Sequence, residues 1–302
     1  MQGTPNLPTL LFLAGLLCSC VTTTEEPTPG PCEGLELGKV EVFASGFGGN
    51  EGISFSPDGR MFISAGEAII EIFDDGTWSQ VATVAGSIGL AWWNEHLMVA
   101  ANDSGLGNGL DGVFKVDVDM GTTELLGTGI EGANFLTVTP WGTLLVAADS
   151  APGIQEITSD GQVSVWAAGV PSPNGMAFNA DQSVLWVATT FADPAPVWKL
   201  PITEGMAGTP VSVTEYSPGN VPDGVAMGLS DDVYVALNVA ATIDRISAEG
   251  SVTTLATGID WAASLAFGEG ENFDPCSIYA TSLFGDEVFR IIAAEPGLVP
   301  LR

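Results

Sequence analysis

The chain has 302 residues, and its 37 acidic residues outnumber its seven basic residues to give a formal net charge of −30. This balance excludes nucleic acid as a partner, because phosphate contacts need clustered Lys and Arg side chains. Anionic membrane surfaces are disfavoured as partners too, except through a lipid anchor. Thirty-eight glycines and 19 prolines interrupt the chain too densely for long helices.

The N-terminal residues predict export from the cell. Residues 10–17 are apolar but too few to span a bilayer, which is typical of a signal peptide over residues 1–19. The segment ends in an LCSC motif that resembles a bacterial lipobox and implies lipidation of Cys20. No Lys or Arg stands in residues 1–6, so ordinary signal cleavage nearby stays open as an alternative. We expect an outer-membrane or periplasmic lipoprotein, or a secreted protein if the lipobox is not used.

A short tether is expected between the signal peptide and the folded domain. Residues 20–37 are assigned to it, since the stretch 21–31 is rich in Thr, Glu and Pro. Such a composition buries too little apolar surface to fold and predicts a flexible segment.

One short phrase then recurs six times. Each copy has a leading residue, often followed by Gly, then a small apolar stretch, a turn and a β-rich run. The spacings between successive leading residues are 37, 46, 40, 49 and 40. A period in the forties with strand-like content is typical of a propeller blade made of four strands. The leading residues are Glu51, Ile88, Asn134, Asn174, Asp223 and Ala263.

Each repeat also offers an outer strand, except the last. The chain ends soon after segment 287–294, a plausible third strand of the sixth repeat. Segment 39–46 at the other end would complete that blade and remove two free sheet edges. We therefore predict an all-β, six-bladed β-propeller over residues 38–302, with four antiparallel strands per blade and the N-terminal strand in the last blade. The alternative is two separate β domains, but no linker interrupts the period. The expected outer strands are 77–84, 122–129, 162–169, 210–217 and 251–258.

The cysteines predict one disulfide. Cys18 would leave with the signal peptide, and Cys20 would carry lipid. Cys32 precedes the closing strand and Cys276 lies in the sixth repeat, so the propeller brings their segments together. In an oxidising compartment a bridge between them would lock the ring. Two isolated thiols are the alternative.

Four of the six leading residues carry oxygen ligands. The innermost strand of each blade lines the propeller axis, so we expect Glu51, Asn134, Asn174 and Asp223 to converge at one end of the tunnel. Two carboxylates and two amide oxygens suit Ca²⁺ better than Mg²⁺, which demands tighter octahedral geometry. A zinc site is not expected, because zinc is bound mainly by His and Cys side chains and the chain has a single histidine. Spacing alone leaves open that these residues only form turns before strands.

These motifs resemble the senescence-marker-protein/gluconolactonase family of six-bladed propellers, which includes regucalcin and calcium-dependent lactonases and is similar to diisopropyl fluorophosphatase and the paraoxonases. The resemblance lies in a first-blade Glu-Gly at Glu51, a third-blade Asn134, and the PNG and PDG motifs around Asn174 and Asp223. It spans about residues 39–294.

The resemblance implies calcium-dependent hydrolysis of a lactone or related ester. The ion would polarise the carbonyl oxygen, and Asp223 would act as general base or nucleophile. A Ser-His-Asp triad is unsupported, since His96 is the only histidine and is expected on the surface.

Departures from the family pattern change the expected substrate. Gly132 stands where many members carry Arg, and Phe135 stands where Asp usually follows the third-blade Asn. With Trp261 near the sixth leading residue, these changes predict that the tunnel end beside the leading residues is apolar rather than sugar-binding. The equal alternative is that Phe135 and Trp261 pack between blades. The candidate rim residues are Asn102, Asp103, Phe135, Asp149, Asn238 and Trp261.

Two functions remain open on sequence. The first is an exported, monomeric, calcium-dependent hydrolase of small-molecule lactones or esters. The alternative is a non-catalytic cell-surface binding propeller with a structural calcium, since fold does not decide function.

Overall fold

The computed structural model describes residues 1, 3, 31–102, 111–148 and 153–302. Pro31–Arg302 forms one compact unit, and the account below concerns that unit. The predicted signal peptide, the lipidation site Cys20 and the rim candidates Asp103 and Asp149 lie outside the described residues. No helix among the described residues is long and apolar enough to cross a membrane.

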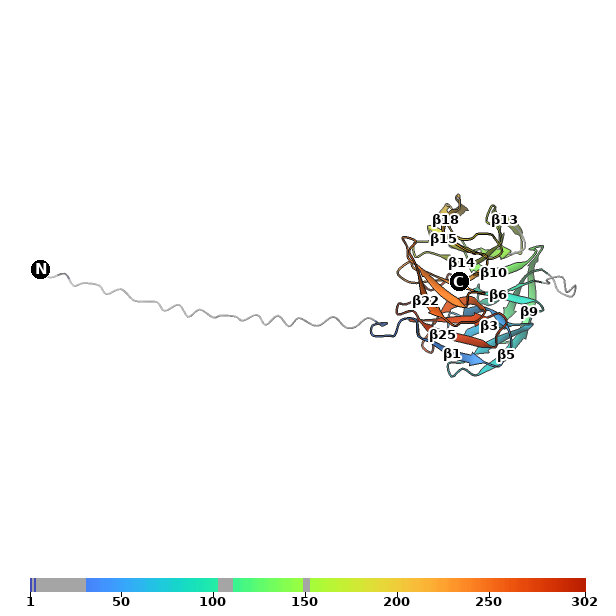
Figure 1. Ribbon diagram of the computed structural model, residues 1–302, viewed down its shortest axis with the longest axis horizontal. Helices are drawn as coiled ribbons and strands as arrows, with labels where there is room; N and C mark the ends of the chain where they lie inside the picture. The colour runs from blue at the N-terminus through green and yellow to red at the C-terminus, as the bar shows by residue number, and fades with distance from the viewer. Residues whose placement is uncertain (2, 4–30, 103–110, 149–152) are drawn as a thin grey trace. The chain divides into compact units, whose positions relative to one another are not determined.

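The described residues form six antiparallel sheets arranged in a ring, which confirms the predicted propeller (Figure 1). The innermost strands contact one another in cyclic order, and the last contacts the first. These strands are β2 (Asn50–Phe55), β6 (Ser87–Trp93), β10 (Ala133–Val138), β14 (Pro173–Phe178), β19 (Pro222–Met227) and β23 (Ala262–Phe267).

Three further strands complete each sheet in the order of the chain, except that the sixth sheet takes its outer strand from the N-terminal end of the domain. The second strands are β3 (Met61–Ala65), β7 (His96–Ala101), β11 (Leu144–Ala148), β15 (Val184–Thr189), β20 (Val233–Leu237) and β24 (Ser277–Ser282). The third strands are β4 (Ala68–Ile72), β8 (Gly112–Asp117), β12 (Ile154–Ile157), β16 (Ala195–Thr203), β21 (Thr242–Ile246) and β25 (Glu287–Ile292). The outer strands are β5 (Trp78–Thr83), β9 (Thr122–Thr128), β13 (Val163–Ala167), β18 (Val211–Tyr216), β22 (Val252–Thr257) and β1 (Val40–Ser45).

The ring closes as predicted. The N-terminal strand β1 pairs with β25 from Val40 opposite Ile291 to Ser45 opposite Glu287. The sequence did not predict β17 (Met206–Ala207), which folds back on the end of β16 in the fourth blade. A strand of two residues carries no periodic signal, so nothing in the pattern marks it.

The predicted disulfide is also confirmed. Cys32 and Cys276 are bonded, with their Cα atoms 5.6 Å apart. Cys32 is buried, although the sequence prediction assigned it to the flexible tether over residues 20–37. A second link joins the same segments: Arg290 of β25 binds Glu41 of β1 at 3.1 Å and Asp274 at 2.9 Å. The two ends of the propeller domain are therefore held by strand pairing, a disulfide and ion pairs.

The hydrophobic core lies between the sheets. Each of six buried clusters combines residues of two neighbouring blades, as where Phe62 and Ile69 of the first blade pack with Leu97 and Val99 of the second. Because both faces of a sheet are covered, second strands such as β11 and β20 are buried along their whole length. This explains why these strands read as continuous apolar runs without alternation.

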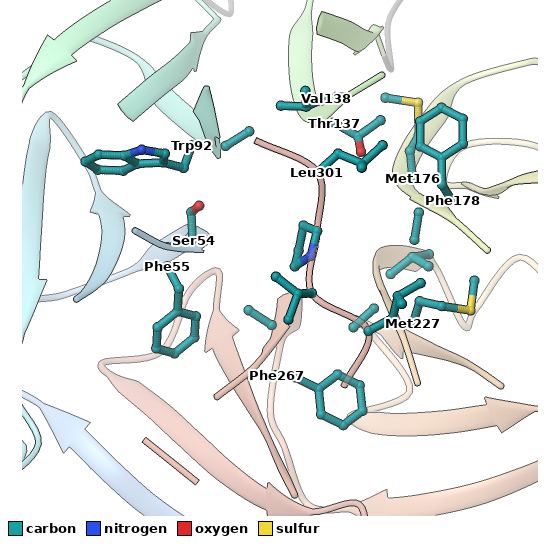
Figure 2. A pocket seen from close by; sticks show the side chains of 18 of the residues that line it. Ser54, Phe55, Trp92, Thr137, Val138, Met176, Phe178, Met227, Phe267 and Leu301 are labelled. Carbon is teal, nitrogen blue, oxygen red and sulfur yellow. The ribbon is translucent and has the colours of Figure 1, made fainter. Parts of the chain in front are cut away.

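The C-terminal tail, residues 295–302, enters the far end of the axial channel, away from the leading residues. The backbone N–H of Leu298 donates to the carbonyl of Met227 at 2.8 Å, and Arg302 forms an ion pair with Glu269. Figure 2 shows Leu301 beside Thr137 of β10, and the tail borders a cavity of about 140 Å³ lined by all six inner strands.

Small side chains leave room for this tail. The fourth residue of the repeat phrase, counted from its leading residue, is small in every blade and lines the channel. These residues are Ser54, Ala91, Thr137, Ala177, Ala226 and Ala266. The apolar residues Leu298 and Leu301 pack against the clusters of the surrounding blades, so the tail fills space that the inner strands do not. The sequence predicted no role for the tail, since three apolar residues in a short end segment have no period.

Candidate functional site

Every leading residue begins a β-bulge. In the first blade Asn50 pairs with Ala65 and Ile53 with Ile63, so Glu51 and Gly52 together oppose one residue of β3. The same two-against-one arrangement occurs in all six inner strands. A bulge bends the strand and re-aims its side chains, and bulges are common beside active sites. The six repeats therefore share a β-bulge at their leading residues.

A glycine directly after the leading residue lets the backbones of neighbouring innermost strands approach each other closely at the bulges. A Cβ added at Gly52 would lie 2.1 Å from the carbonyl oxygen of Ile88 in the next blade. At Gly175 the corresponding distance to the carbonyl oxygen of Asp223 would be 2.4 Å. Only glycine permits this close approach of two backbones. The "often Gly" of the sequence pattern thus reflects contact between blades.

The remaining junctions place the other leading residues in the same ring. A Cβ at Gly89 would lie 2.1 Å from the carbonyl oxygen of Asn134. Between the last blade and the first, the Thr281 hydroxyl donates to the carbonyl oxygen of Glu51. Strands β10 and β14, which carry Asn134 and Asn174, contact each other directly. The structure therefore brings the four predicted ligand positions to one end of the axis.

A strained residue precedes the bulge in several blades. The residue two positions before the leading residue has a left-handed backbone at Ser172 (φ 44°), Val221 (φ 53°) and Trp261 (φ 57°). For β-branched or bulky residues this conformation is an outlier, and it costs about 1–3 kcal/mol. Gly132, where the family resemblance leads one to expect Arg, has φ 69° at the same position of the third blade. Glycine there avoids the strain that the fourth, fifth and sixth blades carry.

The left-handed residue is tied to the end of the second strand. The N–H of Asn238, just after β20, donates to the carbonyl of Val221 at 2.9 Å. The N–H of Asn102 makes the same bond to Gly86 at 2.9 Å in the second blade. These bonds place the ends of the second strands beside the leading residues, where the sequence predicted rim candidates.

Asn238 also contacts Asp223 through its side chain. Its Nδ2 donates to Oδ2 of Asp223 at 3.3 Å and to the carbonyl oxygen of Trp261 at 3.3 Å. Asp223 is 5% exposed and Asn238 is 4% exposed, so the pair is buried. The amide therefore fixes the carboxylate relative to the sixth blade.

The donor set of the ring fits a hard divalent cation. Asn134, Asn174 and Asp223 are buried and Glu51 is half-buried, so two carboxylates and two amides share one end of the channel. Oxygen donors of this kind are the ones that Ca²⁺ takes. Within the described ranges no group of three or more His, Cys, Asp or Glu side chains gathers as a metal site. A calcium site here would thus depend on its asparagines as well as its carboxylates.

Basic side chains of the described residues bind elsewhere in the fold. Arg60 binds Glu71 at 2.8 Å, and Arg245 binds Asp232 on the outer part of the fifth blade. Lys199 donates to the carbonyl of Ala248 at 2.8 Å. Their positive charges are therefore paired on the third strands β4, β16 and β21 and on the turns beside the strands.

Two further sequence candidates have distinct environments. Phe135 packs against the cluster between the third and fourth blades and lines the axial cavity, the environment of a packing residue. Trp261 is 40% exposed and meets Phe284 edge to face, with ring centroids 5.1 Å apart. His96 lies at the start of β7, in the turn away from the leading residues, with Nδ1 2.8 Å from the carbonyl oxygen of Asn94. Substrate contact by Phe135 or Trp261 stays a prediction, and His96 lies in the exposed turn where the sequence placed it.

A comparison with protein families matches residues 65–282 to the family described as SMP-30/Gluconolactonase/LRE-like region. The matched range includes five of the six leading residues, those of the second to sixth blades. The chain belongs to this family. The family resemblance drawn from the PNG and PDG motifs is therefore confirmed. A comparison with curated proteins finds no match.

Solved structures share the fold of this chain at low sequence identity. A gluconolactonase from Xanthomonas campestris has a TM-score of 0.70 at 15% identity, over 86% of this chain and 89% of its own. A calcium-binding protein, regucalcin, from Agrobacterium tumefaciens has a TM-score of 0.69 at 16% identity, over 86% of this chain and 94% of its own. A luciferin-regenerating enzyme has a TM-score of 0.69 at 13% identity, over 87% and 98% of the two chains.

Sequence reasoning missed part of the rim of this propeller. Phe191, Val239 and Phe284 are exposed on loops next to the leading residues. Each stands two residues beyond the end of a second strand, and the repeat alignment contained that signal. The rim candidates predicted from the sequence were mostly polar, so these apolar residues were missed.

Proposed function

We propose that this protein is an exported calcium-dependent hydrolase of lactones or related esters. The observation that carries the proposal is the set of oxygen donors on four of six equivalent β-bulges, with Asp223 buried and hydrogen-bonded to Asn238. Membership of a family named for gluconolactonases supports the reaction class. Export rests on the N-terminal sequence alone, with the lipid on Cys20 as the proposed anchor.

The residues that would hold the ion are Glu51, Asn134, Asn174 and Asp223. When bound, calcium would polarise a substrate carbonyl and stabilise the negative charge that develops on its oxygen. Asp223 is the group that would take a proton from water or attack the carbonyl carbon. Because a carboxylate that also binds a cation is a weak base, the base role requires a water held beside Asp223. Asn238 acts as a positioning residue, since its amide holds the Asp223 carboxylate in one orientation.

A panel of lactones and aryl esters, assayed with calcium and with chelator, tests the proposal. Hydrolysis of at least one substrate should require calcium and should be lost in Asp223→Asn. Activity that persists in both the chelator and the variant would point to a contaminating esterase. A calcium-loaded parent that turns over no lactone or ester would overturn the proposed reaction.

The second candidate is a non-catalytic binding propeller with a structural calcium. Two departures from the family pattern favour it: Gly132 stands in place of Arg, and Phe135 follows Asn134 in place of Asp. In that case chelation would lower the melting temperature, while no substrate of the panel would be hydrolysed.

A further inference from the structure

One position of the sequence repeat separates the first three blades from the last three by its polarity. The position is the second residue after the end of each second strand. In the first three blades its identity is polar or acidic, and in the last three it is apolar. By blade the residues are Glu67, Asp103, Ser150, Phe191, Val239 and Phe284, of which Asp103 and Ser150 lie outside the described residues.

The apolar residues at this position are exposed to solvent. Phe191 is 72% exposed, Val239 51% and Phe284 71%. Trp261 adds a fourth large side chain by its edge-to-face contact with Phe284, at an interplanar angle of 82°. A single exposed apolar residue needs no explanation, but the same rim position is apolar in three consecutive blades. We call Phe191, Val239, Trp261 and Phe284 the apolar rim.

Hydrogen bonds attach the apolar rim to the candidate site. The Trp261 carbonyl accepts from the Asn238 side chain at 3.3 Å and from the Leu283 N–H at 2.9 Å. Asn238 bonds to Asp223, and Leu283 directly precedes Phe284. The aromatic pair is therefore fixed relative to the Asp223 carboxylate.

The fourth blade has a corresponding attachment. The N–H of Phe191 donates to the hydroxyl of Ser172 at 3.1 Å. Ser172 is the left-handed residue two positions before Asn174. Rim residues of the fourth, fifth and sixth blades thus adjoin the ring on the side that Asn174 and Asp223 provide.

We infer that the apolar rim binds the non-polar part of the substrate, which is an uncharged ester or lactone carrying an aryl or alkyl group. This inference rests on the proposed function, because it takes the ring as the place of the carbonyl. The side chains of Phe191, Val239 and Phe284 cannot hydrogen-bond to the hydroxyl groups of a sugar lactone. Those hydroxyl groups would therefore lose their hydrogen bonds to water on binding there. The net charge of −30 repels carboxylate-bearing substrates and favours neutral ones.

Steady-state kinetics on paired substrates test the inference. The parent should show kcat/KM at least about tenfold higher for a phenyl-substituted lactone than for a polyhydroxylated lactone of the same ring size. The double variant Trp261→Ala/Phe284→Ser should raise KM for the phenyl lactone about tenfold with little change in kcat, since it removes binding shared by ground and transition states. The polyhydroxylated lactone should be affected less than twofold. Met120→Ser is the matched control, because Met120 is 75% exposed but lies in the turn between β8 and β9.

A binding measurement separates this inference from the proposed function. A phenyl-substituted lactam, which resists hydrolysis, is titrated calorimetrically into the parent, the double variant and the control. Weaker binding only in the double variant supports the apolar rim even if no ester is hydrolysed. Equal binding and equal kinetics in all three proteins would overturn it while leaving hydrolysis at the ring intact. Concentration-dependent dimerisation or vesicle binding that the double variant abolishes, without loss of lactam binding, would assign the rim to those partners instead.

Discussion

The Asn238 side chain donates a hydrogen bond to the Asp223 carboxylate, with 3.3 Å between Nδ2 and Oδ2. The two residues are 15 positions apart and come from the second and innermost strand regions of one blade. Both are buried, so the bond is shielded from competing water.

Removal of this bond should weaken both metal binding and catalysis. In Asn238→Ala the Asp223 carboxylate loses its fixed orientation, and a hydrogen bond to a charged group contributes about 1.5–3 kcal/mol. We expect at least about tenfold loss in calcium affinity and in kcat/KM. Asn238→Gln retains the amide donor and should recover part of the loss. Calorimetric titration and kinetics of both variants check this, and unchanged calcium affinity in Asn238→Ala would remove Asn238 from the site.

Two ring variants should separate metal binding from chemistry. Asp223→Asn keeps one oxygen for the ion but cannot accept a proton, so hydrolysis should fall by at least about 10²-fold. Asn174→Ala removes a ligand, so its activity should recover partly in excess calcium. Kinetics over a calcium series distinguish the two. Near-parental turnover by Asp223→Asn would show that the chemistry lies elsewhere.

Acid should destabilise the closure of the ring through Asp274. Burial raises the pKa of this carboxyl, but hydrogen bonds from Ser277, the Cys276 N–H and Arg290 outweigh burial and leave the pKa below its ordinary value of 3.8. A lowered folded-state pKa contributes stability that is present above pH 3.8 and is lost as the pH falls through the folded-state value. Asp274→Asn should therefore melt below the parent at pH 7, and the difference should shrink at pH values below about 4.

Thermal melts between pH 7 and pH 2 measure this effect. Glu36→Gln, at an exposed position before β1, is the control and should follow the parent at every pH. A constant difference between Asp274→Asn and the parent across the whole range would contradict the assignment to titration of Asp274.

The C-terminal tail should stabilise the propeller. Deletion of residues 298–302 removes Leu298 and Leu301 from the channel and breaks the Arg302–Glu269 ion pair. Loss of two partly buried leucines predicts about 2–5 kcal/mol and a fall in melting temperature of several degrees. Arg302→Gln, which breaks only the ion pair, should cause a smaller fall. Calorimetry decides between these outcomes, and a truncated chain that melts with the parent would show that the tail does not stabilise the channel.

Much of this architecture follows from the repeat period. The six inner strands, the outer strands and the closing pair of β1 and β25 were predicted, because each blade repeats one polar–apolar pattern. The disulfide between Cys32 and Cys276 followed from that topology. The bulges at the leading residues did not follow from it, since a bulge is a feature of strand pairing that Gly52 or Gly175 alone does not reveal.

Other features depend on contacts that have no local signal. The bond from Asn238 to Asp223 requires the end of β20 and the start of β19 to meet at a known register. The tail residues 298–302 fill a channel whose width depends on six small residues from six strands. Neither relationship can be read from one segment of sequence.

Calcium binding is the most direct test of the central claim, and it requires no knowledge of the substrate. Chelator-treated protein, titrated with calcium by calorimetry, should bind at least one ion and gain thermal stability in proportion to the free calcium. Asn174→Ala should bind at least tenfold more weakly, as expected for loss of one ligand. A protein that binds no calcium and melts at the same temperature with and without it would contradict the proposed site.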